Sequence, residues 1–172
     1  ATLSSDAAPT SSKKKQRLEV PSVILKRTRQ SRAFLDGNQL IFTKAVDGIE
    51  CTVKVADIVQ IQVEEQNKDV KAATLGWGVY NPDSLYKVRI LCHVHVQPVL
   101  HKRIQKSASA EEAMREIVKH HFQVALQTRQ VMNLPSKGTD TYRLVHGEGD
   151  CLSRLAVDII ESTAGVMSSA AW

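Results

Sequence analysis

The strongest constraint on the fold is a change in the period of the apolar residues near residue 109. Before it, residues 20–96 contain short runs rich in β-branched and aromatic residues, separated by turn-forming residues. The runs that predict strands are 40–46, 51–55, 57–63, 70–80 and 84–96. Strands this short and closely spaced favour a small barrel. Gly76 and Gly78 lie inside one run and indicate a bulge or a close backbone approach there.

After residue 109 the apolar residues recur at helical spacing. Ser109 and Glu112 form a capping box, and Asn133 and Pro135 stop the pattern, which predicts one helix from about 110 to 133. Its apolar stripe comprises Ala113, Met114, Ile117, Val118, His121, Phe122, Val124, Ala125 and Thr128. Strands are expected at about 141–146, 154–160 and 163–169. The predicted fold class is α+β: a small β-barrel followed by a long amphipathic helix packed on a small antiparallel sheet.

Positive charge is concentrated at the start of the chain. The formal net charge of the 172 residues is +5, but residues 1–32 alone hold eight basic and two acidic residues, a local +6. The remainder carries a net −1. A concentrated basic segment attracts a polyanion and releases its counterions, so RNA, DNA or an acidic protein surface is a plausible partner. For Lys13 to Arg17, a solvated tail is an equally good interpretation.

Residues 1–18 are rich in Ala, Ser and Thr and have no periodic apolar pattern, so we expect a disordered basic tail. The same composition is found around plastid and mitochondrial presequence cleavage sites, which suggests a chloroplast or other organelle, with the cytoplasm as the alternative. The three cysteines share no CxxC spacing and predict neither a disulfide framework nor a zinc knuckle. No apolar run reaches the length of a membrane span, so no membrane partner is expected.

Several side chains that could carry chemistry have plainer interpretations. His93 and His95 share one side of a strand, but no third ligand stands at a supporting spacing, so no metal site is predicted. Glu148 and Asp150 could form an acid–base pair or a cation site, yet Gly-Glu-Gly-Asp between two strands is also ordinary turn chemistry, which we favour. Cys151 is a weak candidate nucleophile. We therefore predict no catalytic residue in this chain.

The order of three segments is more specific than their chemistry. They are "VILKRTRQSRAFLDGNQLIFTKAV", "GWGVYNPDSLYKVRIL" and "TYRLVHGEGDCLSRLAVD". The second carries a Gly-x-Tyr-x-Pro-x-Ser pattern at Gly78, Tyr80, Pro82 and Ser84. The third carries a second signature at Tyr142, Arg143, Leu144, Gly147, Glu148, Asp150, Leu152 and Asp158. Together, over roughly residues 23–172, they resemble the N-terminal PUA and hairpin region of the large-subunit ribosomal RNA cytosine-5 methyltransferase family, in an organellar or plant-like version.

The resemblance implies a PUA-like barrel over residues 19–97 and a helix-and-hairpin domain over 98–172. It also implies structured RNA, in particular ribosomal RNA, as the partner. The RNA-binding residues would be Lys26, Arg27, Arg29 and Arg32 at the barrel edge, and Arg143, which could instead pair with Glu148. The family's S-adenosylmethionine domain and catalytic cysteine are expected to lie outside this chain, so we expect it to bind no cofactor and to be inactive alone. The alternative is a non-catalytic scaffold docked in a larger protein assembly.

Overall fold

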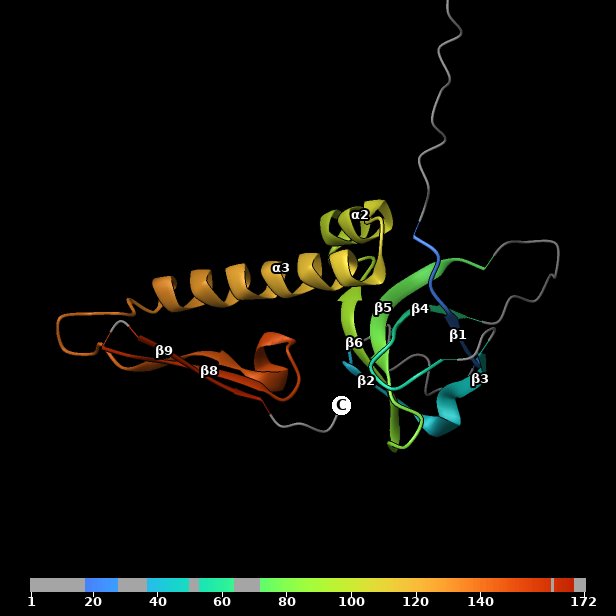
Figure 1. Cartoon of the computed structure of the whole chain (residues 1–172), viewed down its shortest axis with the longest axis horizontal. Helices are drawn as coiled ribbons and strands as arrows, with labels where there is room; N and C mark the ends of the chain where they lie inside the picture. Colours follow the sequence, from blue (N-terminus) through green and yellow to red (C-terminus); the bar gives the residue numbers. More distant parts are fainter. Residues whose placement is uncertain (1–17, 28–36, 50–52, 64–71, 162, 169–172) are drawn as a thin grey trace, which may run out of the picture.

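The computed structural model describes residues 18–27, 37–49, 53–63, 72–161 and 163–168. Its elements form a six-stranded sheet in the first half of the chain and a three-stranded sheet in the second, and two helices connect the sheets (Figure 1). This arrangement confirms the predicted α+β class. Within the described residues, no helix is long and apolar enough to span a bilayer.

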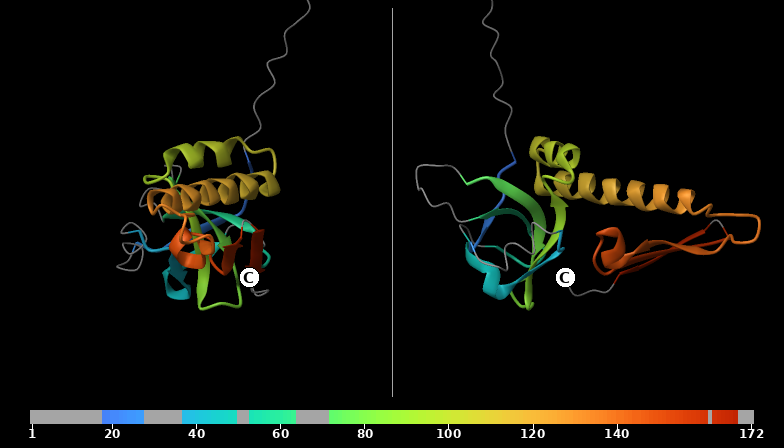
Figure 2. Two further views of the ribbon diagram at one scale, coloured as in Figure 1. Left: turned by 90° about the vertical axis from the view of Figure 1, so that its left-hand side faces the viewer. Right: turned by 180° about the vertical axis from the view of Figure 1, so that it is seen from behind.

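The six-stranded sheet curls into a half-barrel around the first apolar core (Figure 2). Its strands are β1 (Ser22–Leu25), β2 (Leu40–Phe42), β3 (Val46–Ile49), β4 (Ile58–Val63), β5 (Thr74–Tyr80) and β6 (Tyr86–His93), with the 3-10 turn η1 (Thr43–Ala45) between β2 and β3. Their order is β2-β6-β5-β4-β1-β3, and only β1 and β4 pair in parallel. The core side chains include Val23, Leu25, Ile41, Val59, Ile61, Val88 and Ile90. Most are β-branched, the type that packs best on a pleated sheet.

The predicted runs 40–46, 57–63, 70–80 and 84–96 each contain a strand, which is shorter than predicted. The run 51–55 forms no strand in its described part, and β1 lies in none of the predicted runs. The run 40–46 is divided between β2, η1 and the start of β3. Residues 53–55 form no strand: a turn follows, with Ala56 at φ 69° and the Asp57 carboxylate accepting a hydrogen bond from the Lys54 amide at 2.8 Å. The run 84–96 ends as a strand at His93. Turn chemistry local to these segments outweighed their β-branched composition.

Gly78 allows two strands of the half-barrel to approach closely. A Cβ atom at this position would lie 2.5 Å from the carbonyl oxygen of Arg89 and 2.7 Å from a methyl carbon of Val88. Only glycine avoids that clash. The β5–β6 turn that follows is fixed by the Asn81 side chain, which accepts a hydrogen bond from the Asp83 amide at 2.9 Å. The Gly-x-Tyr-x-Pro-x-Ser pattern therefore marks a close strand contact followed by a tight turn.

A second apolar core lies between the half-barrel and the helices α2 (Pro98–Lys106) and α3 (Ala110–Val131). It joins Trp77 and Leu91 of the sheet to Leu100 and Ile104 of α2 and to Ile117 of α3. The sequence analysis missed α2, because nine residues between a strand and a capping box are too few to show a clear helical period.

Helix α3 begins as its capping box predicts. The Ser109 hydroxyl accepts a hydrogen bond from the Glu112 amide at 3.2 Å, and the Glu112 carboxylate accepts one from the Ala108 amide at 2.6 Å. Its buried face is narrower than predicted, because Val124 is 44% exposed and Thr128 is also exposed. The helix extends beyond the half-barrel, so only one side of its second half meets another element (Figure 1).

That element is the hairpin sheet, which consists of β7 (Tyr142–His146), β8 (Leu155–Ile160) and β9 (Thr163–Ser168) in the antiparallel order β7-β8-β9. These strands match the predicted ranges within about one residue. A small core of Ala125, Val145, Leu152 and Val157 joins the sheet to α3. Between β7 and β8 lies the 3-10 turn η2 (Gly147–Asp150). The long helix packed on a small antiparallel sheet is thus confirmed.

Candidate nucleic-acid interface

The structure describes only part of the predicted basic edge. Lys26 and Arg27 directly follow β1; the Lys26 side chain is half-buried and Arg27 is exposed. The Lys26 amide donates a hydrogen bond to the Ala45 carbonyl at 2.9 Å, which fixes the chain where it leaves the strand. Arg29 and Arg32 lie outside the described residues. The role of all four in RNA binding remains a prediction.

Arg143 lies far from that edge. It belongs to β7, whereas β1 occupies the side of the half-barrel away from the hairpin sheet in both Figure 1 and the rear view of Figure 2. Its guanidinium does not pair with Glu148. It donates two hydrogen bonds to Asp158 on the neighbouring strand, at 2.8 and 3.0 Å. These bonds raise the pKa of Arg143 and lower the pKa of Asp158.

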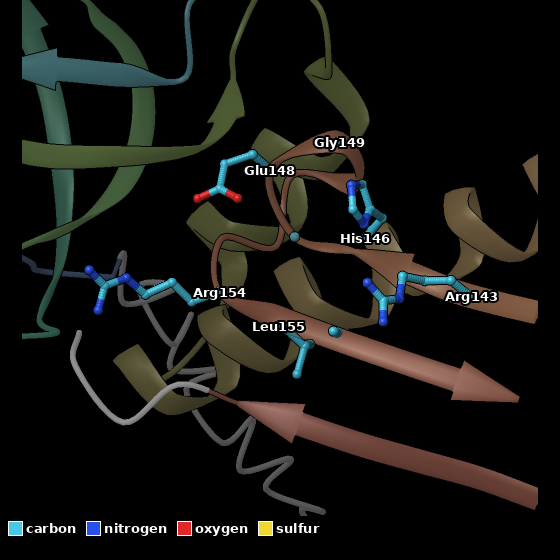
Figure 3. A pocket seen from close by; sticks show the side chains of 8 residues that line it. Arg143, His146, Glu148, Gly149, Arg154 and Leu155 are labelled. Carbon is cyan, nitrogen blue, oxygen red and sulfur yellow. The ribbon is translucent and has the colours of Figure 1, made fainter.

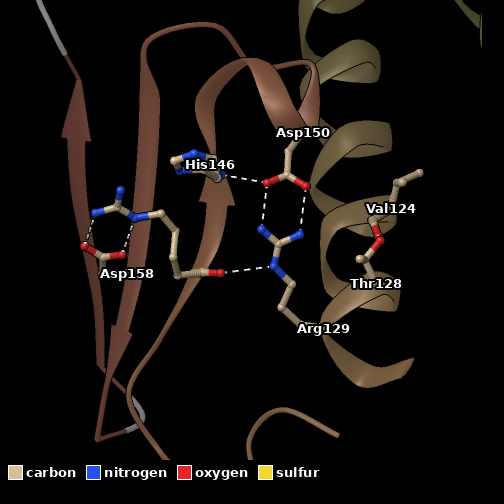
Figure 4. Close-up of polar contacts among 7 residues, drawn as sticks. Val124, Thr128, Arg129, His146, Asp150 and Asp158 are labelled. Carbon is tan, nitrogen blue, oxygen red and sulfur yellow. Dashed lines mark hydrogen bonds and ion pairs between the residues drawn. The ribbon is translucent and has the colours of Figure 1, made fainter. Parts of the chain in front are cut away.

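The polar segment between β7 and β8 is a structural turn that ties the hairpin sheet to α3. We refer to residues 147–154 as the elbow. Asp150 accepts two hydrogen bonds from Arg129 of α3, both at 2.8 Å, and a third from the His146 amide at 2.6 Å (Figure 4). Burial alone would raise the pKa of Asp150, but these hydrogen bonds outweigh it and lower the pKa. Asp150 is therefore an ionised partner of Arg129 rather than a proton donor.

Glu148 has a different partner from Asp150. Its carboxylate accepts a hydrogen bond from the Ser153 hydroxyl at 2.6 Å, and this bond is the main reason that its pKa is lowered. The two carboxylates thus serve separate contacts and do not form an acid–base pair, so the turn interpretation of the elbow is confirmed.

The described thiols are poorly suited to nucleophilic chemistry. Burial and the nearby Asp150 raise the pKa of Cys151, whose sulfur accepts a hydrogen bond from the Gln39 side chain at 3.0 Å. Burial raises the pKa of Cys92 to about 12. Both therefore remain protonated thiols at neutral pH, the unreactive form. Cys151 contributes instead to the contact between the elbow and the half-barrel.

The histidines have structural contacts. His121 is buried, and its Nε2 donates a hydrogen bond to the Leu91 carbonyl at 2.6 Å, which holds α3 against β6. The rings of His93 and His95 lie 5.8 Å apart and meet edge to face. In the part of the chain that the structure describes, no group of three His, Cys, Asp or Glu side chains is placed to hold a metal.

A shallow hollow of about 260 Å³ lies beside the elbow. Arg143, His146, Glu148 and Arg154 line it, together with backbone and apolar atoms of neighbouring residues (Figure 3). The Glu148 carboxylate and the Arg154 guanidinium extend from the elbow toward the strands of the half-barrel. The charges of Glu148 and Arg154 act on Arg89 of β6, a buried residue that the sequence analysis did not single out. This electrostatic interaction joins residues far apart in sequence, so no local pattern could reveal it.

Comparison with known proteins finds a match for the half-barrel. Residues 23–93 match the family described as a PUA-like domain. The match covers the half-barrel from within β1 to the end of β6 and agrees with the predicted barrel. No curated protein matches the sequence.

Solved structures extend the likeness beyond the half-barrel. The chain is similar to the "Crystal structure of SMU.776, a putative methyltransferase complexed with SAH", with a TM-score of 0.51 and 14% sequence identity. The similarity covers 86% of this chain, so it extends well beyond the half-barrel. The chain spans about a third of the length of that protein (33%). At this level of identity, the likeness establishes a shared fold.

Proposed function

We propose that this chain is the RNA-binding module of a ribosomal RNA cytosine-5 methyltransferase that uses S-adenosylmethionine. The observation that carries the proposal is the PUA-like match over residues 23–93. It is supported by a fold likeness, over 86% of this chain, to a protein described as a putative methyltransferase. The signature from Tyr142 to Asp158 supports the narrower assignment to the cytosine-5 family.

In this proposal the chain binds RNA and does not itself catalyse methyl transfer. The positive charge of residues 1–32 would lie against phosphates, which positions the RNA, while the loops of the half-barrel read its shape. The methyl donor would belong to the part of such enzymes that this chain does not span. An organellar site of action, in a chloroplast or elsewhere, is also a proposal, based on the composition of residues 1–18.

A scaffold is the second candidate, and one observation favours it. The edge strand β9 exposes Val166 and Met167, which are 65% and 58% accessible, and Ile160 at the end of β8 is also exposed. Apolar side chains along an open sheet edge suit a protein partner. In that case, the chain would copurify with proteins and would bind RNA no better than a neutral protein of its size.

A filter-binding titration of the intact chain tests the proposal. We expect it to bind a folded ribosomal RNA fragment, and the logarithm of its affinity should fall linearly with the logarithm of salt concentration, because each phosphate that the chain neutralises releases a counterion. Titrating unstructured single-stranded DNA in parallel controls for simple charge attraction, and folded RNA should bind more tightly. Equal affinity for the two polyanions would favour a nonspecific basic tail.

A further inference from the structure

Arg89 is a buried arginine on the outer side of the half-barrel. Its side chain is 8% exposed, and its Nε has no hydrogen-bond partner among the described residues. It pairs in register with Leu40 of β2 and Val79 of β5, so apolar side chains surround its stem. Burying a guanidinium without a hydrogen-bonded anion is costly, which suggests that something else completes this site.

The strand pattern directs Arg89 toward the elbow. Val88 and Ile90, its neighbours in sequence, belong to the core inside the half-barrel. Leu91, two residues on, packs in the second core with the helices. Side chains two apart on a strand share a side, so Arg89 points outward as Leu91 does. On the adjacent strand edge, the Gln39 side chain reaches Cys151 of the elbow at 3.0 Å.

We call the region between Arg89 of β6 and the elbow the joint. The charges around the joint do not balance. The charges of Arg154 and Glu148 in the elbow act on Arg89: burial and the charge of Arg154 lower the pKa of Arg89, while Glu148 raises it. The Glu148 carboxylate is already hydrogen-bonded to Ser153. The ion pairs near the elbow, Arg143 with Asp158 and Arg129 with Asp150, are each neutral overall. Two arginines and one carboxylate therefore leave a surplus of one positive charge.

We propose that the joint between the half-barrel and the elbow binds one backbone phosphate of RNA, held between Arg89 and Arg154. Guanidinium groups match the geometry of phosphate oxygens and can donate two hydrogen bonds to them. Glu148 is the opposing group: it partly neutralises the arginines in the empty joint and repels the incoming phosphate. The inference rests on the proposed RNA-binding function and adds a phosphate site shared by the two halves of the chain.

Two substitutions with opposite expected effects test this site. Arg154→Gln should weaken binding of the folded RNA fragment about three- to tenfold and reduce its salt slope by about 0.9, as expected when one fewer phosphate is neutralised. Glu148→Gln should tighten binding by a similar factor, because it removes the repelling charge while an amide oxygen still accepts from Ser153. Arg115→Gln and Glu111→Gln are the matched controls, since this exposed ion pair lies on α3. Each control should change the affinity less than twofold.

The alternative is that Glu148 and the two arginines only hold the joint together. Both elbow substitutions would then lower the melting temperature and weaken RNA binding alike, which would overturn the proposal. An Arg154→Gln variant that binds like Arg115→Gln would overturn it too, while the intact chain still bound RNA and the proposed function stood. If the intact chain itself binds no folded RNA, the proposed function fails, and this site fails with it.

Discussion

Asp150 and Asp158 both accept two hydrogen bonds from one arginine, but their surroundings differ. The side chains of Asp150 and Arg129 are only 10% and 12% exposed. Arg143 and Asp158 lie across two strands of the hairpin sheet and are open to solvent. Water and salt screen an exposed pair, whereas removing one member of a buried pair leaves an uncompensated charge. The same chemistry should therefore matter for folding in one place and hardly at all in the other.

The substitution Asp150→Asn should lower the free energy of unfolding by about 3 kcal/mol, because it leaves the buried Arg129 without its counter-charge. Asp158→Asn is the matched control and should leave the denaturation midpoint almost unchanged. Urea denaturation of both variants measures the difference. Equal stability losses would show that the Arg129 pair is not buried as described and that α3 is held to the hairpin by other contacts.

At the scale of elements, α3 connects the two halves of the molecule. Ile117 lies in the core shared with the half-barrel, and Ala125 in the core shared with the hairpin sheet. His121, between them, is bonded to the backbone of β6. The same face of α3 thus packs on the half-barrel in its first half and on the hairpin sheet in its second half. The helix thereby sets the separation of the two sheets.

Ile117→Ala should cost about 2–5 kcal/mol of unfolding free energy, because it opens a cavity in a closed core. Val124→Ala, on the exposed side of the same helix, provides the control and should change stability far less. Thermal or urea denaturation followed by circular dichroism distinguishes the two. Comparable losses at both positions would mean that a partner or another part of the chain covers the exposed side.

The sequence predicted those elements whose signals are local. The capping box at Ser109 and the apolar period placed α3, and alternation placed the hairpin strands. Helix α2 is short and closely follows a strand, so its sequence shows no clear helical period. The apolar stripe predicted on α3 was too wide, because periodicity does not show how far the packed neighbouring elements extend along the helix. The pairing of Arg143 with Asp158 and the approach of Arg89 to the elbow depend on long-range packing. A single sequence does not contain that information in readable form.

The two proposed RNA-binding sites lie apart in the molecule. Lys26 and Arg27 follow β1 on the far side of the half-barrel (Figure 1), whereas Arg154 extends from the elbow toward the strands of the half-barrel (Figure 3). An RNA that touched both would have to be large enough to reach around the half-barrel. The domain boundaries at residues 18 and 97 remain predictions.

We propose that the half-barrel binds folded RNA through its basic edge. The most direct test replaces Lys26, Arg27, Arg29 and Arg32 together with Gln and repeats the filter-binding titration at two salt concentrations. Binding should weaken strongly and the salt slope should fall by about 0.9 for each phosphate that the variant no longer neutralises, while the melting temperature stays nearly the same. Deleting residues 1–18 is the control and should weaken all polyanions alike. An unchanged affinity and slope in the fourfold variant would show that RNA does not bind at this edge.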